Sequence, residues 1–214
     1  MRNMKKSVYS VLLSDDLVSR IDAAAYKKGI SRSAMIDRVL AEYLEEETIE
    51  MKMNNVFDNM ERMIAGCSGL RFLSQASDYM ASVQSALAYR YNPTVKYSIE
   101  LYPEGALGQL KITLRTKNDS LLRIMEKFYS FFIGLEKKYI GERAYAYDGF
   151  RFVRVFVRPE GMNAETAGRA IAAYVADFDK YLRIYFADLD NEPAARLEVE
   201  KQYAADVSVK EVIL

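Results

Sequence analysis

The fold of the amino-terminal part is decided by two stretches of sequence, SVYSVLLSDDL at residues 7–17 and GISRS at residues 29–33. The first stretch alternates up to Ser14, which is typical of a short β-strand over residues 7–13. Such a strand has two faces, one made of Tyr9, Val11 and Leu13 and the other of Val8, Ser10 and Leu12.

Two helices are predicted to follow the strand. Ser14 is a good N-cap for the first helix, and Asp15 and Asp16 complement its positive end. Gly29 ends this helix, and Ser31 can cap the second. The apolar stripes that these helices would bury consist of Leu17, Ile21, Ala24 and Ala25 in the first, and Met35, Ile36, Val39, Leu40, Tyr43 and Leu44 in the second.

A unit of one strand and two helices is too small to be stable alone. Its single strand leaves backbone donors and acceptors unpaired, and about 40 residues form too small a core. Two copies that pair their strands would solve both problems. The sequence therefore predicts a homodimer.

This order of strand, capped helix, glycine and Ser-Arg-Ser helix start resembles the ribbon-helix-helix repressors of the MetJ, Arc and CopG type. The resemblance covers about one fifth of the chain. In that family two strands form an antiparallel ribbon that enters the major groove of double-stranded DNA, while the second helix contacts backbone phosphate. The resemblance implies a sequence-specific DNA-binding transcriptional regulator of the repressor type, acting as a homodimer or higher oligomer.

The resemblance also assigns roles to residues. Tyr9, Val11 and Leu13 would form the core of the dimer ribbon, and the DNA-binding residues would be Lys5, Lys6, Val8, Ser10, Leu12, Ser31, Arg32 and Ser33. The groove face departs from the family pattern, which places long polar side chains there. Val8 and Leu12 offer only apolar contact, for instance to a thymine methyl.

Composition limits the other functions. The first 38 residues carry eight Lys or Arg against four Asp, although the whole chain has no net charge. The chain has no histidine and one cysteine, Cys67, so the commonest general base and metal ligand are missing. We expect no catalytic site, metal or cofactor. No signal sequence or apolar run of about 18 residues is visible, which predicts a cytoplasmic protein without a membrane segment.

The chain is expected to be α+β. We divide it into a ribbon-helix-helix domain at 1–47, a helical connector at 48–69, an α+β oligomerisation or effector domain at 70–191 and a charged tail at 192–214. The third part is predicted to have the order α-β-β-α-β-α, beginning with a helix over 70–91. Its first two strands are expected to form a hairpin around the turn at 103–108, and Asn118 and Asn163 to cap the two later helices. The connector has heptad-like spacing, which suits either a dimer partner or its own domain; the residues concerned are Ile49, Met53, Val56, Met60 and Met63.

Two sets of residues in the third part are candidate sites. Packing is the favoured role for a group of tyrosines that could instead line an effector pocket, namely Tyr89, Tyr91, Tyr97, Tyr102, Tyr145 and Tyr147. Arg151, Arg154 and Arg158 suit either anion binding or an ion-paired surface. The helix over 119–139 has apolar residues on more than one face, so it is a candidate interface for tetramers or higher oligomers, unless its own domain covers it.

Two alternatives to a repressor remain. The first is a non-DNA interaction or scaffold protein that uses the ribbon only to dimerise. The second is a plasmid-accessory or antitoxin DNA-binding protein. The scaffold would correspond to a dimerisation ribbon that has lost DNA binding. A large folded carboxy-terminal domain is unlike the short, poorly ordered tail of an antitoxin.

Overall fold

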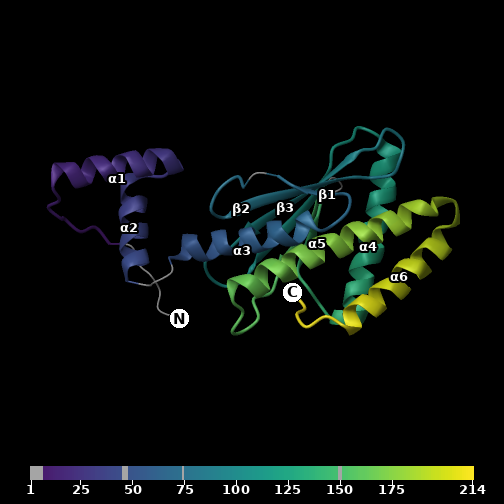
Figure 1. Ribbon diagram of the computed structural model, residues 1–214. Helices are drawn as coiled ribbons and strands as arrows, with labels where there is room; N and C mark the ends of the chain where they lie inside the picture. The colour runs from purple at the N-terminus through teal and green to yellow at the C-terminus, as the bar shows by residue number, and fades with distance from the viewer. Residues whose placement is uncertain (1–6, 45–47, 74, 149–150) are drawn as a thin grey trace. The chain divides into compact units, whose positions relative to one another are not determined.

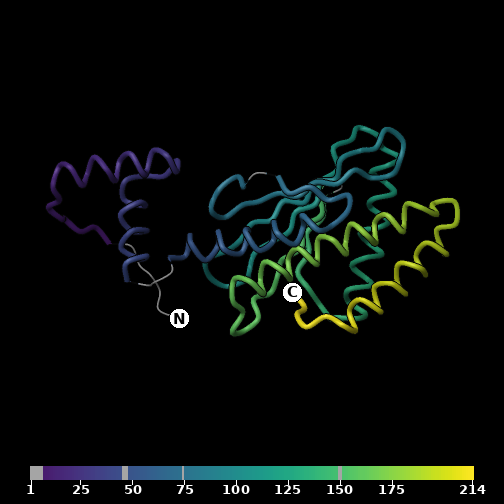
Figure 2. The backbone as a smooth tube through the Cα atoms, in the orientation of Figure 1, coloured from purple at the N-terminus to yellow at the C-terminus, as the bar shows by residue number. Residues whose placement is uncertain are grey.

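The computed structural model describes residues 7–44, 48–73, 75–148 and 151–214. The chain divides into two compact units, an amino-terminal unit at 1–48 and a carboxy-terminal unit at 49–214. Each unit has its own elements (Figures 1 and 2). The described residues form six α-helices and one six-stranded antiparallel sheet, which makes the chain an α+β protein as predicted.

The two helices of the amino-terminal unit form where the sequence predicts them. Helix α1 spans Asp15–Lys28 and α2 spans Arg32–Tyr43. The caps are also as expected, because the Ser14 hydroxyl accepts from the Leu17 amide and the Ser31 hydroxyl accepts from the Ala34 amide. Gly29 ends α1 in the left-handed conformation, at φ +66°, which glycine adopts without strain.

The segment before α1 has no regular secondary structure within the single chain. Residues 7–14 form neither strand nor helix, and every side chain in this segment is exposed. The strand predicted over 7–13 is therefore not present in an isolated copy. A strand needs a neighbour to pair with, and the two helices of the same unit provide none.

The carboxy-terminal unit is built on a sheet with the strand order β1-β2-β3-β4-β6-β5, and every neighbouring pair is antiparallel. The strands are β1 Leu70–Phe72, β2 Met80–Ala86, β3 Thr94–Leu101, β4 Gly108–Leu114, β5 Tyr145–Tyr147 and β6 Arg151–Phe156. The predicted hairpin is confirmed as β3 and β4, which pair from Val95 with Leu114 to Leu101 with Gly108.

Helices cover one face of this sheet (Figure 1). They are α3 Ile49–Ala65, α4 Asp119–Ile140 and α5 Ala164–Ala187, while α6 Glu192–Ser208 packs on α4 and α5. The centre of the covered face is fully buried and includes Val83, Tyr97, Ile112 and Phe152, which lie next to one another across four strands. Most side chains of the opposite face remain at least partly accessible and many are polar, as is common for antiparallel sheets.

The helix predicted over 70–91 is wrong, because this stretch contains β1 and β2. Strand β2 pairs with β3 along its whole length, from Met80 with Glu100 to Ala86 with Thr94. Its inward residues Ala81, Val83 and Ser85 follow the two-residue period of a strand. The small residues of this stretch favour a helix locally, but pairing with a neighbouring strand outweighs that preference.

The predicted order α-β-β-α-β-α needs two further corrections. Residues 145–147 form β5, which completes the sheet edge beside β6. The residues from Glu192 onward are not simply a charged tail, since α6 buries Ala195, Val199 and Tyr203, and Leu214 is 3% exposed. The order in the carboxy-terminal unit is α3-β1-β2-β3-β4-α4-β5-β6-α5-α6 with one short 3-10 turn, Leu189–Asn191.

The helix predicted as a connector lies within the carboxy-terminal unit. Helix α3 packs along α5, and its heptad-spaced residues Met53, Val56 and Met60 are buried in this unit. The heptad spacing allowed this helix to pack on a dimer partner or on its own domain. The buried residues show that it packs on its own domain. The glycine-rich turn at 66–69 joins α3 to β1 inside this unit.

Helix α4 was predicted as a candidate oligomer interface unless its own domain covers it, and the structure favours cover by its own domain. Its aromatic residues Phe128, Tyr129 and Phe132 are at most 3% exposed and pack on Phe152 of β6, Phe178 of α5 and Tyr203 of α6. The sheet covers one side of α4 and helices α5 and α6 cover another. Because helices of the same unit bury the excess apolar surface, none of these rings is free for a partner.

None of the helices in the described part of the chain is both long enough and apolar enough to cross a membrane.

Candidate nucleic-acid interface

The segment at 7–14 presents two sets of side chains that differ in exposure. Val8 and Leu12 of the predicted groove face are fully exposed, and Ser10 is exposed as well. On the predicted ribbon core, exposure falls from 82% at Tyr9 to 72% at Val11 and 38% at Leu13. The predicted core set is therefore the less exposed of the two, although all of its side chains are still exposed in the single chain.

The start of α2 brings together the other predicted site residues. Ser31 uses its hydroxyl as the N-cap, and Ser33 is exposed in the first turn. Arg32 makes a bidentate ion pair with Asp22 of α1, with Nε–Oδ1 at 2.6 Å and Nη2–Oδ2 at 2.5 Å. This pair lowers the pKa of Asp22, chiefly through the hydrogen bond from Arg32. The guanidinium is thus held beside the helix start, but it is not without a partner.

The two helix starts of the amino-terminal unit differ in charge. The first turn of α1 contains Asp15 and Asp16, whereas the first turn of α2 contains no acidic residue. Backbone amides at a helix start favour an anion, and nearby carboxylates oppose it. Phosphate is therefore accommodated better at the start of α2. Lys5 and Lys6, the remaining predicted DNA-binding residues, lie outside the described residues.

Most of the apolar side chains in the amino-terminal unit are not buried. Only Ala25, Met35 and Ala41 are buried hydrophobics among its described residues. Large apolar side chains that remain at least 38% exposed are Val8, Tyr9, Val11, Leu12, Leu13, Leu17, Tyr26, Val39, Leu40, Tyr43 and Leu44. A surface with this much exposed apolar area is typical of an interface that a partner covers.

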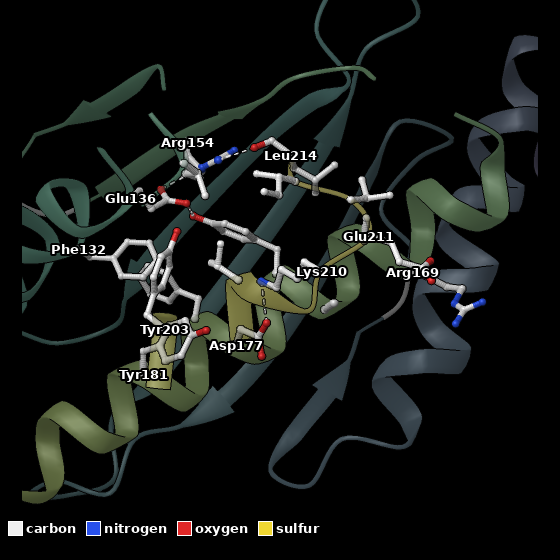
Figure 3. A pocket seen from close by; sticks show the side chains of 18 of the residues that line it. Phe132, Glu136, Arg154, Arg169, Asp177, Tyr181, Tyr203, Lys210, Glu211 and Leu214 are labelled. Carbon is white, nitrogen blue, oxygen red and sulfur yellow. Dashed lines mark hydrogen bonds and ion pairs between the residues drawn. The ribbon is translucent and has the colours of Figure 1, made fainter. Parts of the chain in front are cut away.

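A second polar cluster lies inside the carboxy-terminal unit, around Glu136 of α4 and Arg154 of β6 (Figure 3). Both side chains are fully buried, and Arg154 Nε donates to Glu136 Oε2 at 3.1 Å. Tyr145 and Tyr174 donate their hydroxyls to the same carboxylate, at 2.5 Å and 3.1 Å. Burial raises the pKa of both tyrosines and the carboxylate adds to the rise, so both hydroxyls stay protonated.

The rest of the Arg154 guanidinium is satisfied by the backbone. Its Nη1 donates to the Val155 carbonyl at 3.1 Å, and its Nη2 donates to the main-chain oxygen of Leu214 at 2.6 Å. The cluster lines a hollow of about 230 Å³, which the ion pair of Asp177 and Lys210 lines as well (Figure 3). Ligand pockets usually begin at about 300 Å³. The small volume and the internal partners indicate a structural ion pair.

The tyrosines predicted to line an effector pocket do not gather at one place. Tyr97 is buried and donates to Asp179 at 2.8 Å, Tyr89 packs edge-on against Phe186, and Tyr91 is 99% exposed. The tyrosines at the hollow are others, Tyr174, Tyr181 and Tyr203. Their helical positions on α5 and α6 gave them the pattern of ordinary core residues. No sequence signal distinguished them.

The three predicted arginines have three different environments. Arg151 pairs with Asp148 at the surface, and Arg158 donates to the backbone carbonyls of Tyr102, Gly105 and Ala106. Arg154 is the buried partner of Glu136. Ion pairing or internal hydrogen bonding therefore accounts for each of them, and they do not form a common anion site.

Comparison of this chain with models of protein families, with curated proteins and with solved structures finds no match.

Proposed function

We propose that the chain is a sequence-specific DNA-binding transcriptional regulator that acts as a ribbon-helix-helix homodimer. The observation that carries the proposal is the amino-terminal unit, in which two capped helices follow an exposed alternating segment that has no partner strand among the described residues. In the proposed dimer, residues 7–13 of two copies pair as an antiparallel ribbon. Each copy then supplies the backbone hydrogen bonds that the other lacks.

Burial supports the dimer. A core of Ala25, Met35 and Ala41 is too small to keep two helices folded, and each fully buried large apolar side chain contributes about 1.5 to 3 kcal/mol. A second copy would cover the ribbon core residues Tyr9, Val11 and Leu13 together with exposed residues of α2. These include Val39, Leu40 and Tyr43.

The outward face of the proposed ribbon enters the major groove. Val8 and Leu12 contact apolar groups such as thymine methyls, and the Ser10 hydroxyl supplies a hydrogen bond. Phosphate is held by the amides at the start of α2 and by Arg32. This face has few hydrogen-bonding groups, so we propose that phosphate contacts supply much of the affinity.

Placing proline at Ser10 is expected to prevent both dimerisation and DNA binding by the full chain. Proline has no backbone N–H and disrupts a strand within a two-stranded ribbon. Sedimentation measures the dimer, and selection of bound sequences from a random duplex pool measures sequence preference. The control is Ser10→Ala, which keeps the amide and loses only the hydroxyl, so it should dimerise and bind with altered sequence preference. A Ser10→Pro protein with an unchanged dimer constant and unchanged DNA sites would contradict the proposal.

A second candidate function is a scaffold that uses the ribbon only to dimerise. The apolar groove face formed by Val8 and Leu12 favours it, because such a face also suits a protein partner. The same experiment separates the two functions. The scaffold function is identified if two results are found together. Ser10→Pro abolishes the dimer, and the wild type enriches no DNA sequence.

Substitutions in the Arg32–Asp22 pair should have opposite effects on DNA affinity. Arg32→Ala should weaken binding to all duplexes similarly and reduce the salt slope, log K against log salt concentration, by about 1. Asp22→Asn should strengthen binding, because it releases Arg32 and removes a negative charge near phosphate. Anisotropy titrations at several salt concentrations measure both, with Asp37→Asn as the control for net charge. Loss of binding at one sequence alone after Arg32→Ala would show base readout instead.

A further inference from the structure

The face of the carboxy-terminal sheet that the helices leave open carries an unusual set of cations. Pairing places Arg71, Gln84, Lys96, Thr113 and Arg151 next to one another across β1, β2, β3, β4 and β6. At about 4.8 Å between strands, this row extends over about 19 Å. Lys111 and Arg115 stand two residues before and after Thr113 along the chain, so they lie on the same face.

Most of these cations lack the carboxylate partner that many helix cations have. Among the described residues, four of them form no ion pair, and we call these four the basic strip: Arg71, Lys96, Lys111 and Arg115. Arg151 pairs with Asp148, and Gln109 Nε2 donates to Glu100, the acidic residue of β3 on this face. By contrast, carboxylates neutralise many cations on the helices, including Lys127, Lys137, Lys138, Arg169, Lys180, Arg183, Arg196 and Lys201.

Short hydrogen-bonding side chains lie between these cations, and the apolar side chains of Met80, Val153 and Val155 share the open face with them. Ser98 and Thr113 supply hydroxyls and Gln84 supplies an amide between the cations. Lysine, arginine, serine, threonine and glutamine are the side chains that commonly contact phosphate oxygens. The tyrosines of β5, Tyr145 and Tyr147, are paired with Arg154 and Phe152 and so lie on the covered face. The open face of the described strands therefore lacks the aromatic platform on which single-stranded bases stack.

We infer that the open face of this sheet is a second nucleic-acid surface, which binds the phosphate backbone of a duplex through the basic strip. The inference rests on the proposed DNA binding and adds to it a contact that is independent of sequence. Unpaired cations release counterions from DNA on binding, and each phosphate contact contributes about 0.9 to the salt slope. The surface would thus provide the affinity that the apolar groove face of residues 8–12 does not supply.

The test compares two triple variants of the full chain that lose the same charge. One is Lys96→Ala, Lys111→Ala and Arg115→Ala, on the open face. The control is Lys137→Ala, Arg169→Ala and Lys201→Ala, three exposed helix cations that already pair with carboxylates. Anisotropy titrations on a random-sequence duplex, at several salt concentrations, give the salt slope. Circular dichroism checks that both proteins are folded.

The open-face variant is expected to lose up to about 3 from the magnitude of the salt slope, and the control should keep it. A Lys96→Arg, Lys111→Arg variant should bind as the wild type does. Equal slopes for the open-face variant and the control, in a protein that binds its selected DNA site, would overturn this inference and leave the proposed function intact. Binding that the open-face variant loses and Ser10→Pro retains would instead overturn the ribbon and support the sheet.

A further measurement replaces the duplex with vesicles of anionic phospholipid, because a cationic face also suits a charged membrane surface. The wild type is expected to prefer the duplex at equal ionic strength. Binding to vesicles and not to duplex, lost in the open-face variant, would overturn the inference in favour of a lipid surface.

Discussion

Replacing Arg154 with methionine is expected to destabilise the carboxy-terminal unit by about 3 to 5 kcal/mol. The substitution leaves the Glu136 carboxylate buried without its cation, although Tyr145 and Tyr174 still donate to it. It also removes the hydrogen bond that Nη2 makes to the main chain of Leu214 and the contact of the guanidinium with the Tyr174 ring, at 4.9 Å. Urea denaturation of the full chain, followed by tyrosine fluorescence and circular dichroism, measures the loss.

Two further variants identify the buried charge as the cause. Arg151 lies three residues earlier on the same strand, but it is exposed and pairs with Asp148, so Arg151→Met should cost no more than about 1 kcal/mol. Adding Glu136→Gln to Arg154→Met removes the uncompensated charge and keeps an acceptor for the tyrosines. This double variant should be more stable than Arg154→Met alone. An Arg154→Met protein as stable as Arg151→Met would refute the role of the ion pair.

The buried ion pair shows where sequence reasoning reached its limit. Arg154, within the otherwise apolar stretch 152–157, was visible in the sequence, and an ion-paired role was among the expectations for it. Its partner Glu136 lies on a different element, 18 residues away along the chain, in the last turns of α4. Glu136 stands beside Lys137 and Lys138, which read as a solvated helix end. Only the tertiary arrangement distinguishes the buried carboxylate from its exposed neighbours.

Local signals predicted elements well where the chain supplies its own hydrogen bonds. Ser14, Ser31, Asn118 and Asn163 were all predicted as N-caps, and each accepts a hydrogen bond from a backbone amide in the first turn of its helix. The hairpin of β3 and β4 was predicted from alternation and a turn between the strands. In each case the determining residues lie within a few positions of one another, so a window of sequence contains the cause.

Prediction failed where the cause is distant in sequence. Strand β2 becomes a strand because β3 pairs with it, and a sequence rich in alanine and serine gives no local sign of that. Helix α6 was missed for a related reason, since its outward face is charged and only three of its residues are buried, Ala195, Val199 and Tyr203. The strand predicted over 7–13 is absent from the single chain for the same kind of reason, because its proposed partner strand lies in another copy.

Gly168 of α5 provides the second large effect, and it arises from the close packing of two helices. A Cβ atom at this position would lie 2.4 Å from the Val56 carbonyl oxygen and 2.8 Å from the Asn59 Cβ, both on α3. Backbone and a helical Cβ cannot move aside as the tip of a side chain can. Gly168→Ala is therefore expected to destabilise the carboxy-terminal unit by about 1 to 3 kcal/mol through overpacking, and Gly168→Val by more.

A glycine in α4 offers a matched control. Gly134 also lies inside a long helix, but a Cβ there would meet no atom within 4 Å. Gly134→Ala should stabilise the protein by about 0.5 to 1 kcal/mol, because alanine restricts the unfolded chain and favours the helix. The same substitution thus has opposite signs at the two sites, measured by the same urea titration. Since helix propensity favours alanine at both, a stabilising Gly168→Ala would mean that α3 and α5 do not approach each other this closely.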